Sequence, residues 1–319
     1  PFVVVQNISD FSVSDDGTLV YRNRVGVSGR QQLVWADRKG NVEGIIGQPQ
    51  ASMKDVALSP DGTRVAVQAL EQGNRDIWIH DIGRGTKTRL TFDPAIDNSP
   101  VWSPQSDRIA FGSWRGIQSD IFLRQADGTG EAEMIEAGPN HAVPHDWSPN
   151  GQTLVYTVAD FSINNWDIWS MSLDGDKAPS PFQEDTFRMG QGQFSPDGKY
   201  LAYMSERSGQ PEVYVTRWPS GDGLWQVSVN GGIYPRWKGS EIFYVEFQAT
   251  PVVTTVLMAA PVEMTASAPH IGTPQPLFSR VGVERLAGGN ADGRWYDITA
   301  DGQRFVVLQA EQQDRQDRR

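Results

Sequence analysis

Cysteine is absent from this sequence of 319 residues, which excludes disulfide bonds and thiolate chemistry. No stretch reaches the ~18 consecutive apolar residues of a membrane-spanning helix, so no direct membrane insertion is predicted. Basic residues do not cluster outside the last few positions, and the formal net charge is −11. Because nucleic-acid phosphates attract basic patches, a nucleic-acid partner is not expected. The composition indicates an acidic globular protein.

The motifs of common catalytic sites are also missing. There is no G-x-S-x-G pentapeptide, no Gly-rich loop with a Lys, no H-E-x-x-H pair and no kinase catalytic set. Ser28, with Gly26 before it and Gly29 after it, comes nearest to a nucleophile turn but lacks the spacing. We therefore predict no catalytic residue and no cofactor.

What the sequence does contain is a repeated turn between two apolar strands, and Ser195-Pro196-Asp197-Gly198 is its clearest copy. Proline fits the second position of a type I turn, Ser or Asp hydrogen-bonds the turn backbone, and Gly closes the turn. Six further copies, three of them degenerate, are centred on Asp16-Gly17, Pro60-Asp61-Gly62, Pro104-Gln105-Ser106, Pro149-Asn150-Gly151, Lys238-Gly239 and Asp301-Gly302.

The spacing of these turns predicts the fold. The closing residues at 17, 62, 106, 151, 198, 239 and 302 are separated by 45, 44, 45, 47, 41 and 63 positions. A period in the forties is typical of a β-propeller, an all-β ring of four-stranded antiparallel blades. Seven turns favour seven blades. Because the stretch from Thr250 to Asn290 is irregular, a six-bladed ring with an overhanging hairpin is the alternative.

The two ends of the chain are expected to close this ring. The last turn has too few strands for a complete blade, and residues 1–7 form an apolar segment without a neighbouring partner. Pairing the N-terminal strand with the last blade would remove two exposed sheet edges. We thus expect one domain over residues 1–310, monomeric in isolation, followed by a charged and disordered tail over residues 311–319.

Loop lengths divide the ring into two faces. The short repeated turns share one face, and longer loops share the other, including the links between blades near 47–55, 92–99, 136–146, 183–192, 228–236 and 279–295. Binding residues are usually found on long loops held by a rigid scaffold. The candidate ligand-binding residues on this face are Asp97, Asn98, His141, His145, Arg188, Tyr234, Arg236 and Trp295.

Only one cluster has the residue types of a metal site, namely His141, His145 and Asp146. Pro144 prevents a helical arrangement of the two histidines, so their spacing of four residues carries no metal-binding signature. Hydrogen-bonded or solvated histidines are the favoured interpretation, and no metal ligand is predicted.

The S-P-D-G turn followed by strands such as Leu201-Ala202-Tyr203 resembles the repeat of TolB-like, WD-type β-propellers over almost the whole chain. This family includes the periplasmic protein TolB, the propellers of prolyl oligopeptidase-type hydrolases, and modules attached to some bacterial serine/threonine kinases. The stretch from Arg294 to Gly302 looks most similar to the kinase-linked modules. The resemblance implies a fold more specifically than a function.

Two classes of function follow. The leading hypothesis is a non-catalytic propeller, a sensor or scaffold in a larger bacterial protein, that binds a protein or peptide on the long-loop face. The resemblance implies a periplasmic or extracytoplasmic location, with a cytoplasmic one still open. The alternative is a hydrolase or lyase with a site at the channel mouth, or the accessory propeller of a peptidase.

Overall fold

The computed structural model describes residues 8–13, 19–23, 30–183, 185–248, 254–265, 268–281 and 294–311. Within these ranges the chain is built of strands and turns only, which confirms the all-β prediction. None of the described segments forms a helix that could cross a membrane.

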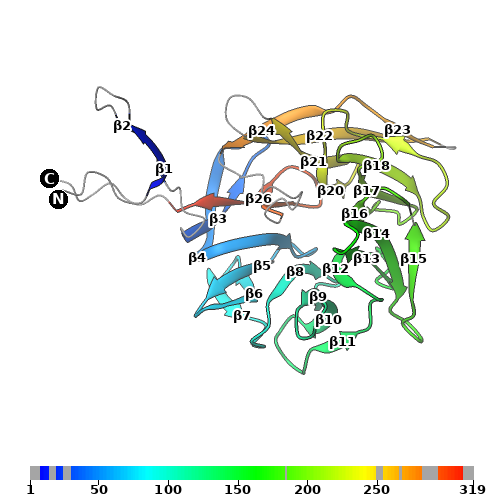
Figure 1. Ribbon diagram of the computed structural model, residues 1–319, viewed down its shortest axis with the longest axis horizontal. Coiled ribbons are helices and arrows are strands. Elements are labelled where there is room, and N and C mark those ends of the chain that lie inside the picture. The colour runs from blue at the N-terminus through cyan, green and yellow to red at the C-terminus, as the bar shows by residue number, and fades with distance from the viewer. Residues whose placement is uncertain are drawn as a thin grey trace.

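The described strands form a ring of six four-stranded antiparallel units (Figure 1). We number these blades along the chain. Blade 1 contains residues 51–58 of β4 (Val42–Leu58), β5 (Arg64–Glu71), β6 (Asn74–Asp81) and β7 (Thr86–Arg89). Blade 2 contains β8 (Asp97–Trp102), β9 (Arg108–Ser113), β10 (Asp120–Gln125) and β11 (Glu133–Ile135). Blade 3 contains β12 (His141–Trp147), β13 (Thr153–Asp160), β14 (Asn165–Ser172) and β15 (Pro179–Gln183).

The other three blades complete the ring. Blade 4 contains β16 (Met189–Phe194), β17 (Tyr200–Ser205), β18 (Glu212–Arg217) and β19 (Trp225–Gln226). Blade 5 contains β20 (Ile233–Lys238), β21 (Glu241–Gln248), β22 (Thr254–Met264) and β24 (Gln275–Val281), with β23 (Pro269–Ile271) paired to the far end of β22. Blade 6 contains β25 (Tyr296–Ile298), β26 (Phe305–Ala310), β3 (Arg30–Ala36) and residues 42–51 of β4.

One long strand, β4, belongs to two blades. Residues 42–51 pair with β3, and residues 51–58 pair with β5. Ser52 and Asp55 have φ angles of 50° and 53°, so the strand bends between its two halves. The link expected near residues 47–55 is therefore wrong, because this segment is part of a strand and not a loop.

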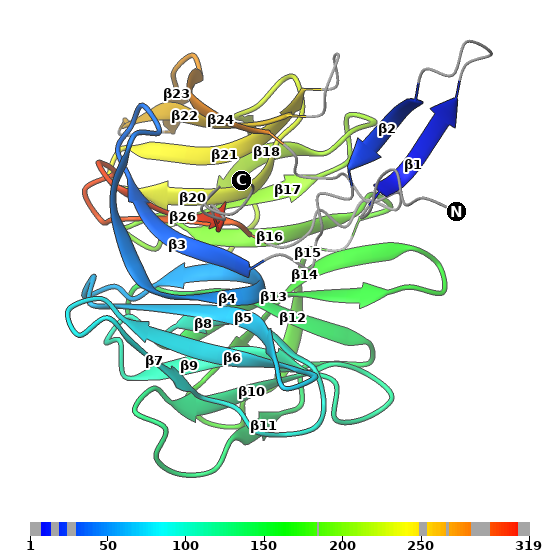
Figure 2. The same cartoon turned by 90° about the vertical axis from the view of Figure 1, so that its left-hand side faces the viewer.

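The number of blades also differs from the favoured count. The first repeated turn lies between β1 (Ile8–Val13) and β2 (Leu19–Asn23), which pair only with each other among the described strands. Figures 1 and 2 show this hairpin apart from the ring. The described strands therefore fit the six-bladed alternative with an overhanging hairpin, and a seventh blade is not confirmed.

Strands from both ends of the chain meet in blade 6. β26 lies between β25 and β3, with Val306 opposite Trp35 and Val307 opposite Val34. β3 thus occupies the place beside β26 that was expected for residues 1–7, and those residues lie outside the described part of the chain. The domain boundary at residue 310 and the disordered tail remain predictions.

The repeated turns have the hydrogen bonds expected from their residue types. Ser195 Oγ donates to Asp197 Oδ1 (2.6 Å) and accepts from the amide of Tyr200 (3.0 Å). Gly198 has a φ of 70°, a conformation that costs glycine little. The same side-chain pattern occurs at Ser59, Ser148 and Thr299. These bonds keep the turns short, which fixes one face of the ring.

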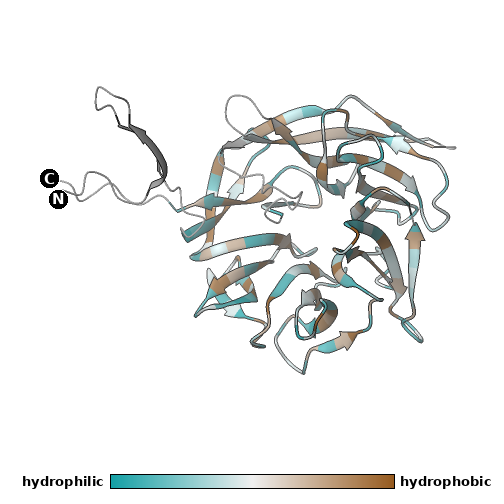
Figure 3. Cartoon of the chain, in the orientation of Figure 1, coloured by the Kyte–Doolittle hydropathy of each residue, from teal (hydrophilic) through white to brown (hydrophobic). Residues whose placement is uncertain are grey.

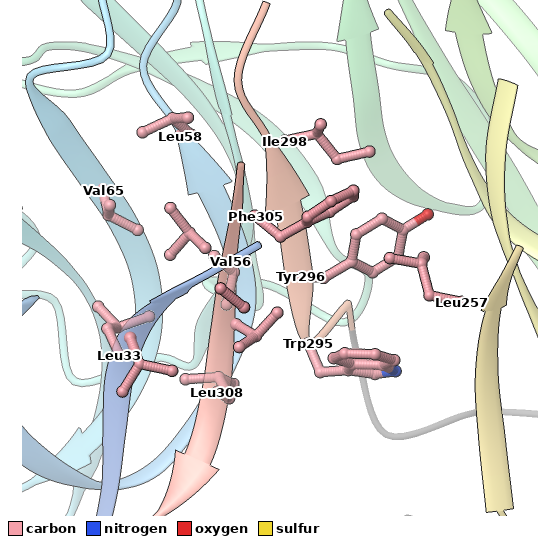
Figure 4. Packing of buried hydrophobic residues seen from close by; sticks show 14 of the residues in the cluster. Leu33, Val56, Leu58, Val65, Leu257, Trp295, Tyr296, Ile298, Phe305 and Leu308 are labelled. Atoms are coloured by element: carbon pink, nitrogen blue, oxygen red, sulfur yellow. The ribbon is translucent and has the colours of Figure 1, made fainter. Parts of the chain in front are cut away.

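Apolar side chains pack between the blades. Figure 3 shows hydrophobic and hydrophilic residues alternating along the strands of the ring. The largest cluster joins blades 1, 5 and 6, and Figure 4 shows Trp295, Tyr296 and Phe305 within it. Phe305 is fully buried and meets the rings of Phe243 and Phe278 edge-on, with centroids 5.6 and 5.5 Å away. Burying such a side chain contributes about 1.5–3 kcal/mol, so the closing blade is firmly held.

Candidate binding face and central channel

The first strand of each blade lies nearest the middle of the ring (Figure 1), and we call it the inner strand. The inner strands begin at the face that carries the longer loops. Each runs from that face to a repeated turn, so the alternation of an antiparallel blade places the loops after β9, β13 and β17 on the same side as the links between blades. We call this side the long-loop face.

A bulge recurs in the inner strands, and no sequence motif predicted it. Pairing with the second strand shifts within β4, β8, β12, β16 and β20. Positive φ angles of 50–60° occur at Asp55, Ser99, Gln191 and Tyr234. Each of these residues stands three positions before the apolar residue that precedes a repeated turn. Because these residues are not glycines, the pattern implies a constraint imposed by the closed ring.

Buried charged residues follow the bulge in neighbouring blades. Arg236 Nε lies 3.5 Å from Asp297 Oδ1, and both side chains are almost fully buried. Asp297 also accepts from the amide of Leu58 in blade 1 (2.8 Å). Since Asp297 is in blade 6 and Arg236 in blade 5, these contacts join three blades near the axis of the ring.

A second carboxylate connects the same region to the long-loop face. Asp55 accepts from the amides of Arg294 (3.1 Å) and Ser99 (3.3 Å), which belong to the segment before β25 and to blade 2. Burial raises the pKa of Asp55. The Arg294 guanidinium is buried and donates to the carbonyls of Val56 and Pro100. These contacts tie blade 2 to the end of the chain across blade 1.

His145 and Asp146 lie side by side in β12 with opposite pKa shifts. His145 Nε2 is 2.6 Å from Thr157 Oγ1, and burial, helped by Arg236, lowers the pKa of His145 to about 3. Burial raises the pKa of Asp146 to about 6, although Asp146 Oδ2 accepts from the amide of Phe194 (2.9 Å). Both side chains keep some accessible surface.

Replacing Asp146 should change how stability depends on pH. Because the pKa is raised from its usual 3.8, the folded protein holds a proton between about pH 4 and pH 6 that the unfolded chain releases, and this stabilisation is lost as the pH rises through 6. The stability advantage of Asp146→Asn over wild type should therefore be about 1–2 kcal/mol larger at pH 7.5 than at pH 5. Thermal melts of both proteins at the two pH values measure this difference.

The comparison with wild type is needed because His145 acts in the opposite direction. Its lowered pKa means that stability falls as the pH drops below about 6.5, where the unfolded chain binds a proton that the folded protein does not. Subtracting the wild-type melts cancels this contribution. A variant whose advantage is the same at pH 5 and pH 7.5 would contradict a raised pKa for Asp146.

His141 lies at the long-loop end of β12 between two aromatic rings. Its ring centroid is 4.6 Å from that of Trp114 and 4.7 Å from that of Phe161. His141 Nδ1 accepts from the amide of Ser119 (3.2 Å), so the ring carries its proton on Nε2 in this arrangement. Trp114 is 38% exposed and Phe161 is 51% exposed. We call these three residues the aromatic cluster.

Arg188, beside β16, belongs to a separate group on the same face. It forms two hydrogen bonds with the carboxylate of Glu206, one of them of 2.8 Å, and its Cζ lies 5.1 Å from the ring centroid of Trp166. Both of its strong interactions are therefore made within the chain.

The structure divides the eight candidate residues into groups instead of one convergent patch. Arg236 and His145 lie on the inner strands β20 and β12, His141 is in the aromatic cluster, and Arg188 is paired with Glu206. Tyr234 accepts at its carbonyl from the hydroxyl of Tyr296 (2.6 Å), and Asn98 lies at the start of β8, beside Gly112.

Three candidates have too little exposed surface to be surface anchors, which corrects the expectation from loop position. Asp97 is 0% exposed, and Arg236 and Trp295 are each 5% exposed. Burial raises the pKa of Asp97. Trp295 packs against Tyr296, with ring centroids 5.4 Å apart, inside the largest core cluster. Loop position alone could not predict this burial, because it depends on blades 1, 5 and 6 meeting.

The two histidines of the possible metal cluster have different surroundings. His141 stacks on aromatic rings and His145 bonds to Thr157, which agrees with the hydrogen-bonded interpretation. Throughout the described ranges, no group of three or more His, Cys, Asp or Glu side chains is arranged to hold a metal ion.

Comparison with known proteins shows which propellers this chain resembles. Residues 27–180 match the family model described as PD40, the TolB beta propeller domain. A solved structure from Agrobacterium tumefaciens assigned to TolB superposes with a TM-score of 0.68 and 19% identity, covering 89% of this chain and 99% of that one. Residues 27–180 therefore resemble the TolB beta propeller domain, and the solved structure shows that the fold is a β-propeller.

Three curated proteins show the range of these similarities. An uncharacterized protein of Agrobacterium fabrum is 26% identical over 212 residues, which is 61% of this chain and 69% of that protein. The peptidase YuxL of Bacillus subtilis, also uncharacterized, is 30% identical over 115 residues, 34% of this chain but 17% of the peptidase. The Tol-Pal system protein TolB of Wolinella succinogenes is 27% identical over 165 residues, 50% of this chain and 38% of TolB.

An enzyme also shares the fold. The structure of an oligogalacturonate lyase in complex with manganese superposes with a TM-score of 0.53 and 12% identity, covering 94% of this chain and 95% of the lyase. At this identity the likeness concerns the fold alone, so activity has to be argued from the residues of this chain.

Proposed function

We propose that this chain is a non-catalytic propeller module of a larger bacterial protein, acting as a sensor or scaffold that binds a protein or peptide on its long-loop face. The similarity to TolB supports a periplasmic or other extracytoplasmic location. Attachment to a serine/threonine kinase is a narrower prediction, suggested only by the resemblance of the stretch from Arg294 to Gly302.

The distribution of exposed apolar side chains is the observation that carries this proposal. Of the thirteen large apolar side chains exposed in the described ranges, eight lie in the loops and links of the long-loop face. They are Phe92, Ile96, Trp114, Ile117, Phe161, Ile163, Phe187 and Val229. Clustered exposed apolar residues are typical of surfaces that bind other proteins.

Photo-crosslinking in cells that produce the full chain tests which face binds. A photoreactive amino acid at Ile163, which is 72% exposed on the long-loop face, should form covalent adducts with a protein partner. The same amino acid at Lys199, exposed in a short turn, is the matched control and should form none. Adducts from Lys199 alone, or equally from both positions, would contradict the assignment of the binding face.

The accessory propeller of a peptidase is the second candidate. The 30% identity with the Bacillus subtilis peptidase favours it, because the match spans only 17% of that protein and so leaves room for a separate catalytic domain. This role needs no catalytic residue in the propeller itself. Peptide hydrolysis by the complete parent protein, lost on replacing a nucleophile outside these 319 residues, would support this second role.

A further inference from the structure

We propose that the aromatic cluster of Trp114, His141 and Phe161 binds an arginine or lysine side chain of an extended partner segment. This inference rests on the proposed function and adds the chemical class of the partner. It is carried by the geometry of the three rings and by the charge of the surrounding surface.

The aromatic cluster is a rigid platform built from three segments. Trp114 follows β9, His141 begins β12, and Phe161 follows β13. Gln118 Nε2 donates to the carbonyl of Pro139 (2.7 Å), which ties the loop after β9 to the link before β12. The Trp114 amide also donates to the carbonyl of Ile96 (3.1 Å). A platform held at both sides loses little conformational entropy when a partner binds.

The rings of the platform remain available to a cation. Elsewhere the fold places arginines over aromatic rings, for example Arg115 Cζ at 4.1 Å from the ring centroid of Phe122. Among the residues that the structure describes, no Arg or Lys lies over Trp114 or Phe161, which are 38% and 51% exposed on either side of His141. A cation from a partner could therefore occupy this position, where the negative face of the rings attracts it.

The surrounding charge selects a cation over an anion. Residues 90–170 contain eleven Asp and Glu, three Arg and no Lys, a net charge of −8, although this count includes carboxylates of the short-turn side such as Glu131. Near the platform, Glu136 is exposed, and burial together with Glu136 raises the pKa of Asp120. Asp160 accepts from Asn140 Nδ2 (3.5 Å) beside His141. The nearest arginine, Arg115, already lies 3.3 Å from Asp93.

Apolar side chains flank the platform and explain why the partner should be an extended segment. Ile117 is 97% exposed in the loop that begins with Trp114, and Ile163 is 72% exposed in the loop that begins with Phe161. An isolated cation would leave both uncovered. A segment that alternates basic and apolar residues would contact the rings, the carboxylates and these two side chains together.

Three labelled octapeptides test the proposal with the full chain. Each alternates Leu with one other residue, which is Arg, Gln or Glu. By fluorescence anisotropy in dilute buffer, the Arg peptide should bind about tenfold more tightly than the Gln peptide, and the Glu peptide should not bind. Raising the salt concentration to 0.5 M should weaken the Arg peptide most, because ions screen its charge.

Variants locate the binding on the platform. Trp114→Ala and Phe161→Ala should each weaken the Arg peptide about fivefold or more, and because both rings are partly exposed, the melting temperature should hardly change. Glu136→Gln should weaken binding about two- to threefold. Glu131→Gln is the matched control, since it removes one exposed carboxylate from the short-turn side of blade 2 and should have no effect.

Equal binding of the Arg and Gln peptides, or unchanged binding by Trp114→Ala and Phe161→Ala, would overturn the proposal. If crosslinks form from Ile163 but none of the three peptides binds, the cation inference is wrong and the proposed function stands. If crosslinks from Ile163 fail as well, the proposed function is wrong too.

Discussion

Deleting residues 294–319 should abolish cooperative unfolding of the ring. The deletion removes β25 and β26, so β3 loses one of its two partner strands and the largest core cluster loses Trp295, Tyr296 and Phe305. A typical domain is stable by only about 5–15 kcal/mol, and each buried aromatic side chain contributes about 3–5 kcal/mol when lost. The three side chains together account for about 9–15 kcal/mol, which is comparable to the whole stability before the lost strand pairing is counted. Calorimetry of the truncated chain should show no cooperative transition.

A shorter deletion provides the control. Residues 312–319 are rich in charged and amide side chains, and composition predicts that they do not belong to the packed ring. Removing them should leave the melting temperature within about 1 °C of the full chain. A truncation at residue 293 that still melts cooperatively near the wild-type temperature would show that blade 6 is not closed by β26.

Replacing Arg236 by Met should be the most damaging single substitution of a charged residue. Asp297 would remain buried without its cation, and Asp55 and Asp146 would lose a nearby positive charge. Removing one partner of a buried ion pair costs about 3–5 kcal/mol. At about 2–4 °C for each kcal/mol in a chain of this size, the melting temperature should fall by about 6–20 °C.

Two further variants separate charge from packing. Arg207→Met breaks a similar pair, because Arg207 Nη2 lies 2.9 Å from Asp185 Oδ2, but both side chains are more than a quarter exposed. Surface pairs contribute about 0–1 kcal/mol, so this variant should melt almost like wild type. The double variant Arg236→Met with Asp297→Asn should regain part of the lost stability. Equal melting of Arg236→Met and Arg207→Met would contradict a structural role for the channel pair.

The repeated turn made most of the fold predictable. Ser, Pro, Asp and Gly act through hydrogen bonds within a few residues, as Ser195 and Asp197 show, so a sequence motif is sufficient to find them. The strands on either side of the turn at Ser59 pair with each other for the same reason, since Ala57 lies opposite Ala66.

The shared strand β4 could not be predicted in this way. Gly47 and Pro49 indicate a loop by their local preferences, yet the segment pairs with β3 on one side and β5 on the other. The blade count depended instead on the first repeated turn, whose flanking strands β1 and β2 pair only with each other among the described strands.

The grouping of the longer loops on one face was predictable, but the contacts between the inner strands were not. Asp297 and Leu58 are 239 positions apart in the sequence, and their contact exists only because the ring closes. A signal was nevertheless present: Asp146, Arg236 and Asp297 each stand one residue before the apolar residue that precedes a turn. A polar residue at a repeat position that is expected to be buried is therefore a marker of contacts between blades.

Hydrogen exchange of the full chain with the Arg peptide tests whether a basic segment binds the long-loop face at the aromatic cluster, because it reports both whether the peptide binds and where. We expect slower exchange in residues 113–119 and 160–165 on the long-loop face, and no change in the short turns at 59–64 and 195–200. Protection confined to the short turns would contradict the binding face and the platform together.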